Sequence, residues 1–151
     1  MKTFLEAISQ VEPSVPYLQL EPPYVTGLCE GEASFTYGRQ GDGLRLRFAV
    51  KLHESDQALI FALKTFFGVG GVYRTGTAWQ YVVTDTYELS RLATHFDAYP
   101  LKGSKGEVYR IWRKMLRLKL SNEALNWAEM QSLALQLSAM ALKGRRKPEN
   151  G

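Results

Sequence analysis

The sequence predicts an α+β domain in which helices cover one face of a four-stranded antiparallel sheet. Two pairs of strand-like segments are each joined by a short turn that contains glycine. Segments with apolar residues three or four apart precede, separate and follow these pairs, which is the spacing of amphipathic helices. Hairpins that alternate with helices form a sheet with one helical layer. We therefore expect an αββαββα core plus a C-terminal helix.

The size and composition of the chain suit one globular domain. Its 151 residues are 45% hydrophobic and 23% charged, and a chain of this length buries roughly two-thirds of its unfolded surface. The single cysteine, Cys29, excludes an internal disulfide framework and suits a reducing compartment. Neither a bilayer-spanning stretch nor a signal peptide is evident, so we expect an intracellular location and no membrane partner. The net charge of +4 is mild support for a polyanionic partner.

Composition shifts divide the chain into three parts. We expect an N-terminal arm over residues 1–20, a folded domain over 21–143, and a basic disordered tail over 144–151. The domain opens with Pro22 and Pro23, which suit the first turn of a helix.

The clearest periodic signal is an alternating strand over residues 44–52, paired with a strand over 33–37 through a turn at 40–43. Apolar residues occupy every second position from Leu44 to Leu52, and the positions between them include three cations. A strand with cations on its open face favours contact with a nucleic-acid groove. A solvated face whose charges discourage edge pairing is the alternative.

The remaining elements follow from periodicity and capping residues. We expect helices over 57–67, 85–99, 105–119 and 124–142, and a second hairpin from segments 71–74 and 79–83. The expected helix N-caps are Ser55 or Asp56, Asp85, Ser104 and Ser121, and the expected helix ends are Gly68 and Gly144. Ser104 and Glu107 have the spacing of a capping box.

The helix that opens the domain ends in two carboxylates. Gly27 and Gly31 are four residues apart and give a flat face on which a second helix can pack. Glu30 and Glu32 stand at the C-terminus, which is already the negative end of the helix dipole. A divalent cation such as Mg²⁺ prefers carboxylate oxygens and would relieve the repulsion. The alternative is that both glutamates are solvated surface residues.

The segment Val25-Thr26-Gly27-Leu28-Cys29-Glu30-Gly31-Glu32-Ala33, followed by Ser34-Phe35, resembles the LAGLIDADG motif of homing endonucleases. The stretches 48–56, 66–73 and 95–101 are similar to other parts of that family in the same order, so the resemblance extends from about residue 20 to 143. Only one motif is present. Single-motif members act as homodimers, which implies that the two motif helices cross at Gly27 and Gly31.

The resemblance implies an intron-encoded, site-specific double-stranded DNA endonuclease. Such an enzyme cuts a long pseudo-palindromic target by metal-dependent phosphodiester hydrolysis and leaves staggered ends. Glu32 would bind the catalytic Mg²⁺, for which Mn²⁺ would substitute, and Lys105 would stand near the metal-bound water, with Lys102 as the competing choice. Many relatives carry a water-positioning glutamine where this chain has Leu52, so His53, another polar group or ordered solvent must replace it. A mitochondrial or chloroplast location is also implied.

Strand parity selects the side chains that would face DNA. These are Ser34, Thr36, Gly38, Gln40, Arg45, Arg47, Ala49, Lys51, Tyr73, Thr75, Gln80 and Val82. Tyr73 and Thr75 belong to this set if Val72 points inward, and a register slip would exchange them for Arg74. Arginine can read guanine and glutamine can read adenine.

Other functions remain open on the sequence. The same scaffold could bind DNA without cutting it, or serve as an intron RNA maturase, which would make intron RNA a further partner. A dimeric structural protein with a solvated basic strand is the alternative from another class. An acid at position 32 favours cleavage, because a protein that only binds has no need of negative charge beside phosphates.

Overall fold

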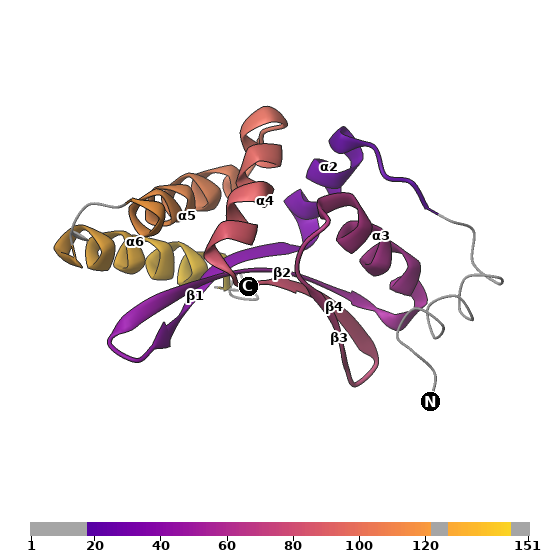
Figure 1. Ribbon diagram of the computed structural model, residues 1–151, viewed down its shortest axis with the longest axis horizontal. Helices are drawn as coiled ribbons and strands as arrows, with labels where there is room; N and C mark the ends of the chain where they lie inside the picture. The colour runs from indigo at the N-terminus through magenta and orange to yellow at the C-terminus, as the bar shows by residue number, and fades with distance from the viewer. Residues whose placement is uncertain (1–17, 122–126, 146–151) are drawn as a thin grey trace, which may run out of the picture.

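The computed structural model describes residues 18–121 and 127–145. Its elements are α2 (Pro22–Glu32), β1 (Ala33–Gln40), β2 (Gly43–His53), the 3-10 helix η2 (Glu54–Asp56), α3 (Gln57–Phe67), β3 (Gly71–Thr75), β4 (Ala78–Val83), α4 (Thr86–Ala98), α5 (Ser104–Leu120) and α6 (Trp127–Arg145). The helices lie on one side of an arched sheet, and the two hairpins extend away from them (Figure 1). The predicted α+β fold is confirmed. The expected arm, apart from residues 18–20, and residues 146–151 of the expected tail lie outside the described residues.

The sheet has the strand order β1-β2-β4-β3, and every pair is antiparallel. Val72 pairs with Tyr81, whose side chain is fully buried. Val72 therefore faces the core, and Tyr73 and Thr75 face the open side, as the register with Val72 inward predicts. Gly41 and Gly76, in the two hairpin turns, have φ angles of 57° and 60°, a conformation that favours glycine.

Phe35 on β1 is the centre of an aromatic core. Its ring centroid lies 5.2 Å from that of Phe48 on β2, 5.4 Å from Phe96 on α4, and 5.2 Å and 5.1 Å from Tyr109 and Trp112 on α5. One strand residue thus anchors two helices to the sheet. The core fills the helix side, and no helix or strand of the described residues covers the opposite face of the sheet.

Helix α5 also fixes the β1–β2 hairpin through three side chains spaced seven residues apart. Lys105 Nζ donates to Ala33 O at 2.6 Å, Trp112 Nε1 donates to Thr36 O at 3.1 Å, and Lys119 Nζ donates to the backbone oxygen of Leu44. Seven residues make about two helical turns, so these donors share one helix face. Burial, with a smaller effect from nearby Arg45, lowers the pKa of Lys119.

Three of the expected helix signals are confirmed. Pro22 and Pro23 occupy the first helical positions of α2. The Asp85 carboxylate accepts hydrogen bonds from the backbone N–H groups of Tyr87 and Glu88, both at 3.0 Å. Gly68 follows α3 with a φ of 73° and ends it.

Other signals are wrong. Helix α5 begins at Ser104 itself, with Gly103 as its N-cap and no side-chain capping bond, so the Ser104–Glu107 capping box does not form. Asp56 precedes α3 but makes no capping bond, and Ser55 lies within η2. Helix α6 continues past Gly144 to Arg145.

Ser121 takes a different place from the one expected. The structure places it at the C-terminal cap of α5, and the expected start of the last helix at 122–126 lies outside the described residues. None of the helices in the described ranges is long and apolar enough to cross a membrane.

Candidate nucleic-acid interface and cleavage site

Helix α2 has one buried face and one open face. Val25 and Cys29 are fully buried in the core, and burial raises the pKa of the Cys29 thiol to about 12, so the thiol stays protonated and acts as a packing group. On the other face, Gly27 and Gly31 are exposed, and a Cβ added at either position would meet no atom of the described residues within 4 Å. Tyr24, one turn before Gly27, is 49% exposed. This face is therefore available to another element.

The two glutamates of α2 have different surroundings. They are two residues apart, so they point about 200° apart around the helix. Glu30 Oε1 accepts hydrogen bonds from the backbone N–H groups of Lys102 at 2.6 Å and Gly103 at 3.0 Å. Glu30 thus caps α5 from a different helix and holds the α4–α5 loop against the end of α2.

Glu32 is exposed at the last position of α2, and its side chain has no hydrogen bond or ion pair within residues 18–121 and 127–145. The Lys105 ammonium group reaches the carbonyl of Ala33, the next residue along the chain, at 2.6 Å. Lys102 lies in the α4–α5 loop. Its backbone N–H donates to Glu30, and its side chain is exposed. The fold therefore brings two lysines and a carboxylate, which has no partner in the described part of the chain, to the same end of α2.

Glu32 fits part of a magnesium site. Across the described ranges, no group of three or more His, Cys, Asp or Glu side chains could hold a metal ion. Mg²⁺, however, keeps several waters and commonly takes one or two protein carboxylates together with phosphate oxygens. The carboxylate of Glu32 suits this role, with the remaining ligands supplied from outside this chain.

Leu52 and His53 lie at the end of β2. Leu52 is partly buried against the core, so it cannot position solvent. His53 is exposed, and its Nδ1 atom accepts a hydrogen bond from the Ser55 backbone N–H at 3.1 Å and lies 2.9 Å from Ser55 Oγ. His53 therefore has its Nδ1 engaged in the turn at η2.

The residues predicted to face DNA all lie on the open face. Paired positions run across it in rows: Gln40 with Gly43, Gly38 with Arg45, Thr36 with Arg47, Ser34 with Ala49, Val82 and Gly71, Lys51 with Gln80 and Tyr73, and Thr75 with Ala78. Arg45 Nη2 donates to Thr84 Oγ1 at 2.8 Å, and Arg47 Nη2 donates to Gln80 Oε1 at 3.1 Å. Ala49, in the middle row, is only 6% exposed.

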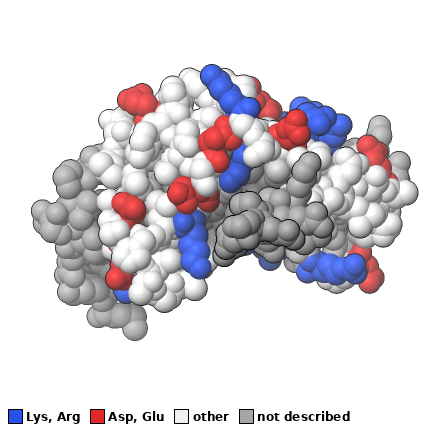
Figure 2. All heavy atoms as spheres, turned by 180° about the vertical axis from the view of Figure 1, so that it is seen from behind, with Lys and Arg blue, Asp and Glu red and all other residues white. Residues whose placement is uncertain are grey.

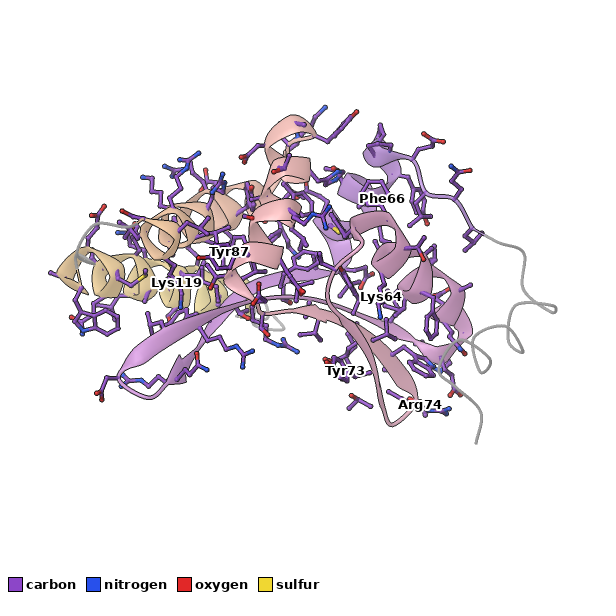
Figure 3. The ribbon with its side chains drawn as sticks, in the orientation of Figure 1. Lys64, Phe66, Tyr73, Arg74, Tyr87 and Lys119 are labelled. Carbon is purple, nitrogen blue, oxygen red and sulfur yellow. The ribbon has the colours of Figure 1, made fainter. Side chains whose placement is uncertain are left out.

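Tyr73 and Arg74 take opposite sides of the β3–β4 hairpin. Tyr73 is 59% exposed on the open face, and its ring lies over Gly71. Arg74 pairs with Glu54 at 2.9 Å and lies 5.8 Å above the ring of Trp79, so it belongs to the other face. Both residues are at the far end of the sheet from Lys119 (Figure 3). Seen from behind, acidic and basic side chains are interspersed (Figure 2), so net charge alone does not identify a binding surface.

Two residues of the site were not singled out for a role by the sequence. Thr26 Oγ1 donates to the Tyr99 backbone oxygen at 2.9 Å and lies 3.0 Å from His95 Nε2, which therefore acts as the donor to Thr26. His95 packs against Phe66 and Phe67 at 5.2 and 5.5 Å, and burial lowers its pKa. Because Thr26 and His95 are 69 residues apart, periodicity could not reveal this link between α2 and α4.

A family model described as LAGLIDADG endonuclease matches residues 25–116. Among curated proteins, the chain is 29% identical over 120 residues to "Uncharacterized 50.9 kDa protein in ND4 intron 1" of Podospora anserina, which covers 73% of this chain and 27% of that protein. It is 26% identical over 127 residues to "Probable intron-encoded endonuclease 3" of Neurospora crassa, a match that covers 78% of this chain and 24% of that protein. The chain thus spans about a quarter of the length of these relatives.

Among solved structures, the chain matches the LAGLIDADG meganuclease I-AabMI bound to uncleaved DNA with a TM-score of 0.72 and 30% identity. The match covers 78% of this chain and 45% of that protein.

Proposed function

Because the chain belongs to the LAGLIDADG endonuclease family, we propose that it is a homing endonuclease domain that cuts both strands of a specific DNA site and leaves staggered ends. The observation that carries this proposal is the Glu32 carboxylate, which has no partner among the described residues. It lies near Lys105, at the end of a helix whose glycines are exposed. The curated relative from Neurospora crassa is named as an intron-encoded endonuclease, and I-AabMI was solved on DNA, which supports the same activity here.

Glu32 holds the catalytic metal in this proposal. A bound Mg²⁺, or Mn²⁺ in its place, activates water, neutralises charge on the phosphate and stabilises the leaving oxygen. The Glu32 carboxylate fixes the position of that ion at the helix end. Glu30 does not share the role, because its Oε1 atom already accepts two backbone hydrogen bonds.

Lys105 is the basic residue of the proposed site. Its bond to Ala33 O keeps the ammonium group next to the end of α2, where it stabilises charge on the phosphate and orients solvent. Lys102 is fixed through its backbone, while its side chain is exposed. We therefore assign this role to Lys105 and not to Lys102. Of the two, only Lys105 has a side-chain hydrogen bond within the described part of the chain.

A second motif helix completes the site. Tyr24, Gly27 and Gly31 form the exposed stripe of α2, on which a second such helix can lie closely. In a homodimer this stripe would meet its own copy, bring two Glu32 carboxylates together, and make the target pseudo-palindromic. The chain covers 45% of I-AabMI, so a second domain in a longer protein is the other source of that helix.

DNA would lie on the open, arched face of the sheet (Figure 1). Arg45, Arg47 and Lys51 on β2 and Gln80 on β4 supply hydrogen-bond donors and acceptors to bases, while the remaining cations contact phosphates. Ala49 is small and nearly buried, so its methyl group can only make apolar contacts. The relatives' intron-related names support expression from an intron, and a mitochondrial or chloroplast gene is the proposed source.

The test is selection of cleaved sites from a randomised duplex library by the full chain in Mg²⁺. The wild type should enrich one long, roughly symmetric site, and Glu32→Gln should bind that site in Ca²⁺ but not cut it. Glu107→Gln, an exposed acid on α5 without a capping role, is the matched control and should cut normally. Binding without cutting by the wild type would instead indicate a regulator on the same scaffold. Full cutting by Glu32→Gln would remove Glu32 from the mechanism.

A further inference from the structure

A groove of about 300 Å³ lies between α4 and the outer side of α5. Its lining includes Phe96 and Tyr109, whose rings pack against Phe35 on the core side of β1 at 5.4 and 5.2 Å. The groove is therefore on the helix side of the molecule, and the core separates it from the open face of the sheet. A duplex held on that face would not occupy the groove.

Four cations of α5 line this groove: Arg110, Arg113, Lys114 and Arg117. Their spacing of three, four and seven residues places them on one helix face. Asp97 is the one carboxylate in the lining. Arg110, Lys114 and Arg117 are exposed and make no ion pair or side-chain hydrogen bond within the described part of the chain. The positive charge of the groove is thus largely uncompensated.

Arg113 is held in place and keeps an unused donor. Its Nε and Nη2 atoms both donate to Asp97 Oδ2, at 3.2 and 3.1 Å, and Asp97 Oδ1 accepts from Tyr109 Oη at 2.8 Å. The third nitrogen, Nη1, is shielded from solvent and has no partner among the described residues. Such unsatisfied groups are rare in native proteins.

The length of the cationic stripe indicates the ligand. From Arg110 to Arg117 it spans about 10 Å of helix, and each strand of a duplex carries one phosphate per roughly 3.4 Å of axis. The stripe can therefore face about three consecutive phosphates, whereas a small anion would use one or two cations. Tyr109, the tyrosine in the lining, is only 8% exposed and offers no stacking surface for a base.

We propose that this groove binds the phosphodiester backbone of a second nucleic-acid segment, on the side of the molecule opposite the cleavage face. Binding there reads no sequence, because the contacts go to phosphates. It does not depend on the proposed endonuclease function, since neither Glu32 nor the open sheet face takes part. The segment is either DNA or RNA, which present the same phosphate chemistry.

The test uses the full chain carrying Arg45→Gln and Lys51→Gln, which weakens the open face, in EDTA to prevent cutting. Fluorescein-labelled 20-bp DNA and RNA duplexes of one sequence are titrated by anisotropy between 50 and 200 mM salt. Three phosphate contacts predict an affinity loss of about fortyfold over this range. Adding Arg110→Gln or Lys114→Gln should reduce the log–log salt slope by about one unit. Arg91→Gln, an exposed arginine of α4 outside the groove lining, is the matched control and should leave the slope unchanged.

The outcomes separate this proposal from the endonuclease function. A log–log salt slope that only Arg110→Gln or Lys114→Gln lowers supports phosphate binding in the groove. The duplex that binds more strongly then shows whether the ligand is DNA or RNA. Equal slopes for Lys114→Gln and Arg91→Gln would overturn the groove site even if Arg45 and Lys51 prove essential for binding the cleaved target. Displacement of both duplexes by polyaspartate at equal charge concentration would also overturn it, because the groove would then select charge alone.

Discussion

Lys105 Nζ donates a 2.6 Å hydrogen bond to the backbone oxygen of Ala33, the residue that follows Glu32. A long, flexible side chain is thereby fixed at the point where α2 becomes β1. The same α5 helix is capped by Glu30, two residues before Glu32. The end of the motif helix and the start of α5 therefore hold each other in place, and the site depends on both contacts.

Replacing Lys105 by methionine should slow cutting by about a hundredfold, the usual size of a lost charge-stabilising group. Binding of the target in Ca²⁺ should change little. The measurement is a single-turnover cleavage rate in Mg²⁺, with the unfolding midpoint recorded to correct for the lost bond to Ala33. Lys102→Met is the paired variant and should stay close to the wild-type rate. The reverse pattern would assign the role to Lys102.

Glu30→Ala should lower the free energy of unfolding by about 1–2 kcal/mol, because two backbone N–H groups of Lys102 and Gly103 lose their acceptor. Chemical denaturation measures this value. Glu107→Ala is the control, since Glu107 does not cap α5, and should change stability by less than about 0.5 kcal/mol. Equal losses of stability in the two variants would indicate that Glu107 also caps α5, as the sequence predicts.

Stability should fall as pH decreases through the ordinary histidine pKa of about 6.5. Burial lowers the pKa of His95 in the folded chain, so below pH 6.5 the unfolded state binds a proton that the folded state does not. The free energy of unfolding therefore rises with pH up to that value and is flat above it. The measurement is urea denaturation at pH 5.5, 6.0, 6.5 and 7.5.

The chain has one other histidine, His53, which is exposed. His95→Gln should flatten the pH dependence between 5.5 and 6.5, and His53→Gln should leave it as in the wild type. A flattening by His53→Gln alone would mean that the burial of His95 does not set this dependence.

Gly27→Ala should separate folding from helix pairing. Alanine is favoured over glycine in a helix by about 1 kcal/mol, and the added Cβ meets no atom of residues 18–121 and 127–145 within 4 Å. At concentrations where the protein is monomeric, the variant should therefore be more stable. In the dimer the methyl group would press on the second helix, so sedimentation should show weaker self-association. Tighter association, or a wild type that stays monomeric at every concentration, would argue against pairing of two copies through this face.

The elements that the sequence predicts well are those whose signal is local. Alternation from Leu44 to Leu52 determines which side of β2 faces the core, because the side-chain period of a strand is two. Asp85 bonds to N–H groups only two and three residues away, and Gly68 needs only its own backbone conformation to end α3. Such features do not depend on how distant segments pack.

The features that the sequence does not predict are set by distant partners. Ser104 and Glu107 have the right spacing for a cap, but α5 has Gly103 as its N-cap. The Gly103 N–H donates to Glu30, which lies 73 residues earlier in the chain. The bond from Lys105 to Ala33 spans 72 residues. The resemblance indicates Glu32 and Lys105 as site residues, yet only the packing of α5 on β1 shows why they lie together.

The proposed site places two Glu32 carboxylates around a divalent ion at the scissile phosphates. A crystal structure of the chain on its selected target in Ca²⁺, which allows binding without cleavage, tests this arrangement. We expect crossed α2 helices with Gly27 and Gly31 in contact, and both glutamates coordinating metal beside the DNA backbone. Glutamates that lie apart and face solvent, with no ion between them and the phosphates, would contradict it.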